Sequence, residues 1–248
     1  MGYDPKKSLC ESLRESQEWG VISPVFLKTK ASSNVNIKIQ ILRNLSIQHL
    51  LGAAHFSRMC YQIDQENQNN LIGDYQQEIT QLVIGSVTLS VAYLESYINE
   101  LLFEGEKKFP DIKSEVVKSY LSLLEDKRIL EKFDHALILY NALPFNKGDT
   151  TYQNIDAVIS LRNGFIHFKP EWHDVPKKHK SISDKLKKKF KPCRFKSEDE
   201  EIFPMGCMTH SCSEWTVKSV IEFIDKFEDI TGKKKSLDNI RNQLKTKP

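Results

Sequence analysis

The feature that most constrains the fold is a run of about thirty residues without proline that begins near Asp74. Apolar or small side chains recur along this run at steps of three and four residues, from Ile79 to Leu102. A helix of that length extends about 45 Å. Because apolar side chains cover more than one of its faces, the run predicts the central helix of an antiparallel helical bundle.

The rest of the chain supports an all-α, mainly helical fold. Only 10 Gly and 9 Pro among 248 residues argue against a loop-rich all-β protein. Strand patterns are few, namely Val21–Leu27 and Ile202–Phe203. Further helices are predicted over about 37–63, 115–124, 125–143, 151–168 and 215–231.

Local signals predict where two of these helices begin or end. Pro170 stops the helix over 151–168, since proline cannot continue the backbone hydrogen-bond ladder. Ser211 and Glu214 have the spacing of a capping box at the start of the last helix. Gly232 is predicted to end that helix.

The helical patterns and the charge runs divide the chain into three parts. Residues 1–70 are predicted to form an N-terminal extension with one helix packed on the bundle. The bundle itself covers 71–232 and contains a charged insert at 177–201. A charged C-terminal tail follows at 233–248.

Composition also bounds the cellular setting. No stretch of about 18 apolar residues is present, so we expect no membrane-spanning helix. The start of the chain lacks the apolar core of a secretory signal. Five cysteines, an odd number, are typical of reduced thiols inside a cell. A cytoplasmic protein is therefore expected.

A cluster of thiols and one imidazole invites a comparison with zinc sites. Cys207, His210 and Cys212 lie close together, with Cys193 upstream. The spacing is at the edge of what zinc ligands use, and no second close pair of cysteines exists. Buried or merely neighbouring thiols are the favoured interpretation, so no metal site is predicted. The usual nucleotide, protease and hydrolase motifs are also missing.

The most informative segment is Ile155–Phe168, which contains Arg162, Asn163 and His167. It resembles the Arg-x4–6-His signature of HEPN domains, helical-bundle proteins many of which are metal-independent ribonucleases. The bare pattern is weak, because Arg43–His49 and Arg128–His135 have similar spacings. We favour the Arg162 copy because it ends a helix of the predicted bundle.

Geometry adds one expectation about this segment. On an ideal helix, residues five apart lie about 140° apart around the axis. Arg162 and His167 share one cleft only if the helix is distorted between them. Gly164, next to Asn163, is the expected position of such a distortion.

A second element strengthens the resemblance, which covers about residues 74–231. The stretch Ala92–Leu102 is similar to a long helix of several HEPN families that carries an acidic residue facing the motif helix. Glu95 and Asn99 are four residues apart and share one face. Glu95 is expected to hold Arg162 by a charge-assisted hydrogen bond.

The resemblance implies a function and a mechanism. The chain would be a cofactor-free endoribonuclease in which His167 acts as acid or base, Arg162 holds phosphate and Asn163 orients it. HEPN ribonucleases usually assemble the active cleft between two protomers, so a homodimer is implied. Such domains commonly serve as toxins or in defence against phage, which implies a regulatory or antitoxin-like protein partner.

Two other functions remain open. Residues 177–196 hold ten Lys or Arg against one Asp, and Lys187, Lys188 and Lys189 stand at their centre. Such a run is usually a solvated loop, but it can attract RNA phosphates. The chain can therefore be a helical RNA-binding protein without cleavage. It can also be a non-catalytic HEPN-like module for dimerisation or docking.

Overall fold

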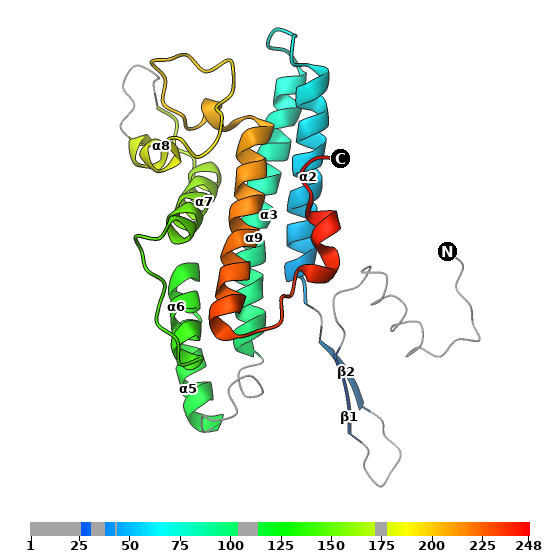
Figure 1. Cartoon of the computed structure of the whole chain (residues 1–248), viewed down its shortest axis with the longest axis vertical. Helices are drawn as coiled ribbons and strands as arrows, with labels where there is room; N and C mark the ends of the chain where they lie inside the picture. Colours follow the sequence, from blue (N-terminus) through cyan, green and yellow to red (C-terminus); the bar gives the residue numbers. More distant parts are fainter. Residues whose placement is uncertain (1–25, 31–37, 43, 104–113, 172–177) are drawn as a thin grey trace, which may run out of the picture.

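The computed structural model describes residues 26–30, 38–42, 44–103, 114–171 and 178–248. Within these residues the chain is an all-α helical bundle, as predicted, with one two-stranded antiparallel ribbon beside it (Figure 1). The strands are β1 (Phe26–Lys30) and β2 (Lys38–Leu42). The helices are α2 (Ser46–Glu66), α3 (Tyr75–Phe103), α5 (Ser114–Leu124), α6 (Ile129–Leu139), α7 (Thr150–Ile166), α8 (Lys180–Leu186) and α9 (His210–Thr231), with the short 3₁₀ helices η1 (Met205–Cys207) and η2 (Asp238–Leu244).

Helix α3 is the centre of the bundle, as its apolar pattern predicted. It packs against α2, α9, α7 and α6. Helix α7 also lies on α9, and α8 covers α7 (Figure 1). The 3₁₀ helix η2 returns to pack against α2.

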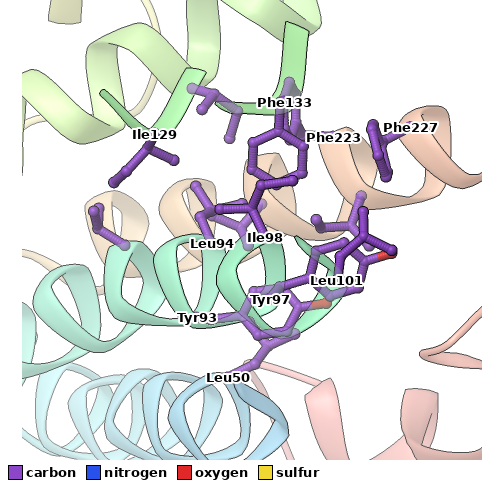
Figure 2. Packing of buried hydrophobic residues seen from close by; sticks show 14 of the residues in the cluster. Leu50, Tyr93, Leu94, Tyr97, Ile98, Leu101, Ile129, Phe133, Phe223 and Phe227 are labelled. Atoms are coloured by element: carbon purple, nitrogen blue, oxygen red, sulfur yellow. The ribbon is translucent and has the colours of Figure 1, made fainter. Parts of the chain in front are cut away.

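An aromatic cluster fills one end of this bundle (Figure 2). Phe133 of α6 meets Phe223 and Phe227 of α9 nearly at right angles, with ring centroids 4.9 and 5.0 Å apart. Tyr97 of α3 stacks on Phe133 at 6.2 Å. Edge-to-face contact between buried rings is a favourable arrangement, so these rings join α3, α6 and α9.

A second cluster fills the other end. It combines Leu161 of α7 and Leu186 of α8 with Phe203 and the thiols of Cys60, Cys207 and Cys212. All of these side chains are buried. This cluster anchors the charged insert to the bundle.

A carboxylate on α3 caps the first helix of the bundle. Glu100 accepts hydrogen bonds at 2.9 Å from the backbone N–H groups of Leu45 and Ser46, and one at 2.6 Å from the Ser46 hydroxyl. The first N–H groups of a helix lack partners within it, and an anion there is stabilising. Glu100 thus fixes the start of α2 against the far end of α3.

Several local predictions were wrong. The helix predicted from Ile37 begins at Ser46 instead, and Lys38–Leu42 form β2. Alternation of isoleucine with Lys38 and Gln40 is the strand period that the helical interpretation overlooked. Strand β1 overlaps the predicted Val21–Leu27 only at its end, and residues 21–25 lie outside the described residues.

The second predicted strand and the capping box were also wrong. Ile202 and Phe203 lie in a turn. Helix α9 begins at His210, before Ser211, and the Ser211 hydroxyl accepts a hydrogen bond from the backbone N–H of Lys191. Gly232 does end the helix, in the left-handed conformation with φ of 65°.

The insert and the tail are both packed on the bundle. Within 178–201, α8 buries Leu186 completely, so the basic run is not simply a solvated loop. In the tail, Leu237 and Leu244 are buried. Both segments therefore contribute to the core.

Helix α3 has one further property. It is long and apolar enough to cross a membrane by length and composition, contrary to the expectation that no segment is. Half of its most apolar window is buried inside the bundle. A central core helix has the same property, which makes this weak evidence for a membrane span.

Candidate functional site

Helix α7 carries the predicted motif, and its start is firmly fixed. Asp149 accepts a hydrogen bond from the Thr151 backbone N–H at 2.8 Å and pairs with Lys226 of α9 at 2.6 Å. The hydrogen bond from Lys226 is the main cause of the lowered pKa of Asp149. Ile155, Val158 and Leu161 bury one face of α7 in the bundle. The motif therefore stands on a well-anchored helix.

The predicted distortion at Gly164 is absent. The His167 backbone N–H donates to the Asn163 carbonyl at 2.9 Å, which continues the helical ladder past the glycine. A Cβ at position 164 would lie 2.8 Å from Ile182 Cδ1 and 3.0 Å from Phe203 Cζ. Gly164 thus permits close packing of the insert against α7, and the helical hydrogen-bond pattern continues past it.

Arg162, Asn163 and His167 lie at the C-terminal end of α7. Arg162 is half-buried, whereas Asn163 and His167 are exposed. Arg162 Nε is buried and has no hydrogen-bond partner. Because the helix is regular, the side chains of Arg162 and His167 leave it about 140° apart. One chain does not bring the two groups together.

The residues on either side of His167 in the chain, Ile166 and Phe168, are apolar. Phe168 stacks on the His179 ring with centroids 5.1 Å apart and planes 8° from parallel. The Nε2 atom of His179 lies 2.8 Å from the Lys169 carbonyl oxygen. Ile166 and Phe168 remain 51% and 45% exposed. The end of α7 therefore carries two partly exposed apolar side chains next to the exposed His167 in the chain.

The predicted supporting residues have other positions. Glu95 is exposed, and within the described residues no hydrogen bond or ion pair joins it to Arg162. Asn99 is also exposed and accepts a hydrogen bond from Lys132 Nζ at 3.0 Å. The two residues share a face of α3, as predicted, but Asn99 contacts α6.

The two competing Arg–His pairs differ from the α7 copy. His135 Nδ1 lies 2.6 Å from the Tyr120 hydroxyl, so that imidazole already has a partner. Arg128 is exposed at the start of α6. His49 is half-buried on α2, and Arg43 lies outside the described residues.

Some lysines of the basic run over 177–196 already make contacts within the protein. Lys187 pairs with Asp184 at 2.5 Å, and this hydrogen bond raises the pKa of Lys187. Lys189 Nζ donates to Asn154 Oδ1 at 2.7 Å. Lys188 is exposed and has a positive φ of 62°. Two of the three predicted RNA-binding lysines are therefore engaged locally.

Sequence reasoning missed Arg194 as an anchor of the insert. Its Nη2 atom donates to the carbonyls of Asn67 and Asn70 at 2.6 and 2.8 Å and to the Tyr75 hydroxyl at 3.0 Å. It also donates to the Gln68 carbonyl. A cation suits the carbonyl-rich end of α2. Nothing in the sequence signals contacts between groups more than a hundred residues apart.

The thiol cluster is structural. Burial raises the pKa of Cys60 to about 12 and that of Cys212 well above its ordinary value. The Nε2 atom of His210 lies 3.1 Å from the Thr246 carbonyl oxygen, and burial lowers the pKa of this imidazole. Across the described part of the chain, no group of three or more His, Cys, Asp or Glu side chains is arranged to hold a metal ion.

Comparison with known proteins adds no relative. No protein-family model, curated protein or solved structure matches this chain.

Proposed function

We propose that this protein is a homodimeric, metal-independent endoribonuclease of the HEPN type that acts in the cytoplasm. The observation that carries the proposal is the state of the motif at the end of α7. Within the described residues, no hydrogen bond or ion pair engages the side chains of Arg162 and His167. A buried guanidinium N–H without a partner costs about 1–3 kcal/mol, which a bound phosphate or a second protomer would offset.

The regular helix sets the geometry of the proposed site. Since Arg162 and His167 leave α7 in different directions, one phosphate reaches both types of group only between two copies of the chain. Arg162 of one protomer would grip the phosphate, and His167 of the other would move the proton. The apolar groups Ile166 and Phe168 supply surface for that contact.

The proposed chemistry is transesterification. One His167 imidazole removes the proton of the ribose 2′-OH, whose oxygen attacks the adjacent phosphorus. The bond from phosphorus to the 5′-oxygen breaks, and that oxygen takes the proton from the same His167 imidazolium. The products are a 2′,3′-cyclic phosphate and a 5′-hydroxyl. Arg162 stabilises the charge on the phosphorane, and Asn163 orients it by hydrogen bonding. A toxin or phage-defence role would place such an enzyme under a regulatory partner.

The test is incubation of tRNA and single-stranded RNA with the purified chain in excess EDTA. We expect cleavage that leaves cyclic phosphate ends and that is lost in both Arg162→Ala and His167→Ala. Mixing the two inactive variants is expected to restore about a quarter of the activity, because half of the random dimers carry one intact composite site. No recovery on mixing would overturn the shared site. No cleavage by the wild type would favour the non-catalytic module.

A further inference from the structure

A cavity of about 520 Å³ lies between α2 and the C-terminal segment, away from the motif. Leu51, His55 and Arg58 of α2 form one wall, and residues of the segment 242–248 form the other. Helices α3 and α9 lie between this cavity and α7 (Figure 1). The cavity is therefore distinct from the proposed RNA-cleaving site.

The charge of the lining is one-sided. Arg58, Lys245 and Lys247 line the cavity together with His55, and no Asp or Glu side chain lines it. Arg58 Nη1 donates to the carbonyls of Gln243 and Lys245 at 2.7 and 2.6 Å, so its guanidinium is held in place by neutral acceptors. Its positive charge is thus positioned but not neutralised.

The two lysines that line the cavity, Lys245 and Lys247, differ in their ion pairs. Lys247 pairs with Glu214 at 3.2 Å, but Glu214 is also held by Lys218 at 2.9 Å. Lys245 is exposed, and no ion pair involves it among the described residues. The cavity therefore keeps an excess of positive charge, which favours an anionic ligand.

The other residues that line the cavity suit a ligand that carries a hydrogen-bonding, partly apolar group beside its anionic one. Asn242 and Gln243 offer amide donors and acceptors beside the cations, and Leu51 adds an apolar side chain. The volume lies in the range of small-molecule sites. Guanidinium and ammonium groups bind phosphate, and amides with an apolar side chain suit a nucleobase.

We propose that this cavity binds a nucleoside diphosphate, with its phosphates on Arg58, Lys245 and Lys247 and its base against Leu51 and the two amides. The test is isothermal titration of the full chain with ADP, GDP, CDP and UDP, each measured separately, and with inorganic pyrophosphate. At least one nucleotide is expected to bind with Kd below about 100 µM, and more tightly than pyrophosphate.

Charge variants locate the binding. Lys245→Glu and Lys247→Ala are each expected to raise Kd by about tenfold or more, since each removes a phosphate contact. Lys234→Glu makes the same charge change as Lys245→Glu, but on an exposed lysine outside the cavity. It is expected to leave Kd unchanged. All three variants should melt like the wild type without ligand.

Three outcomes would overturn the proposal. They are Kd above about 1 mM for all four nucleotides, equal binding of pyrophosphate and nucleotide, and unchanged Kd in both cavity variants. Because the cavity is separate from α7, His167→Ala is expected to bind the nucleotide like the wild type. Loss of the ribonuclease proposal would therefore leave this one standing.

Discussion

The two ends of the bundle differ in how their ionisable side chains are bonded. At the aromatic end, formed by Tyr97, Phe133, Phe223 and Phe227, the Tyr97 hydroxyl donates to the buried carboxylate of Glu228 at 2.8 Å. At the motif end, formed by the end of α7 with the packed insert, Arg162 Nε is buried without a partner and His167 is exposed. At the first end a buried carboxylate is hydrogen-bonded, whereas at the second, within the described residues, no hydrogen bond or ion pair engages the side chains of Arg162 and His167.

Removing a ring from the aromatic end gives the largest expected effect. Phe133 is fully buried and touches both α3 and α9. Phe133→Ala is expected to lower the free energy of unfolding by about 3–5 kcal/mol, because a cavity replaces the ring. Urea denaturation measures this. Phe103→Ala, at a side chain 74% exposed, is the control and should cost less than about 0.5 kcal/mol. Equal effects in the two variants would contradict the comparison.

The buried carboxylate gives the next largest effect. Glu228 accepts hydrogen bonds from the Tyr97 hydroxyl and, at 3.0 Å, from the Ser236 backbone N–H. Glu228→Gln keeps the shape but turns one acceptor into a donor that faces donors. We expect a loss of about 1–3 kcal/mol in the free energy of unfolding, measured by urea denaturation. Glu222→Gln, on the exposed face of α9, should have no effect. If Glu228→Gln leaves the free energy of unfolding unchanged, these hydrogen bonds contribute little to stability.

At the motif end, the sharpest structural test is the Arg194 anchor. Arg194→Ala removes the contacts to the turn between α2 and α3. We expect a cost of about 1 kcal/mol, since the bonds are exposed to solvent. Limited proteolysis is expected to cut residues 187–201 faster than in the wild type. Lys191→Ala, at an exposed position on the same loop, should resist proteolysis as the wild type does. Unchanged cleavage in Arg194→Ala would mean that other contacts hold the insert.

The smallest expected effect concerns pH. Burial lowers the pKa of His210 in the folded protein, so the unfolded chain binds a proton more readily. Stability is therefore lost as the pH falls below the ordinary histidine pKa of about 6.5. The melting temperature of the wild type should fall more steeply between pH 7 and pH 5 than that of His210→Gln, which keeps a donor for the Thr246 carbonyl. If the melting temperatures of the wild type and His210→Gln fall equally between pH 7 and pH 5, the protonation of His210 does not cause the loss of stability.

Much of the fold could be predicted from periodicity, because one helix with apolar residues on several faces must be surrounded by others. The central position of α3 and the end of α9 at Gly232 follow from such local rules. The start of α2 could not be predicted in this way. The alternating isoleucines in 37–41 fit both helical and strand spacing over a short window.

The candidate site was predictable only in part. The sequence identifies Arg162 and His167 by resemblance and locates them near a helix end. It does not reveal that Gly164 serves packing, because the atoms that crowd it belong to Ile182 and Phe203, far along the chain. The contacts of Arg194, and the assembly of the cavity from α2 and the C-terminal segment, likewise depend on tertiary structure.

The most direct test of the account compares a histidine that has no hydrogen-bond partner among the described residues, His167, with one that has a partner, His135. The two variants to compare are His167→Ala and His135→Ala. RNA cleavage in EDTA and the melting temperature are measured on both variants. His135 is bonded to Tyr120, so its loss should lower the melting temperature and leave cleavage intact. His167→Ala should abolish cleavage and leave the melting temperature unchanged. Cleavage that survives in His167→Ala would contradict the account.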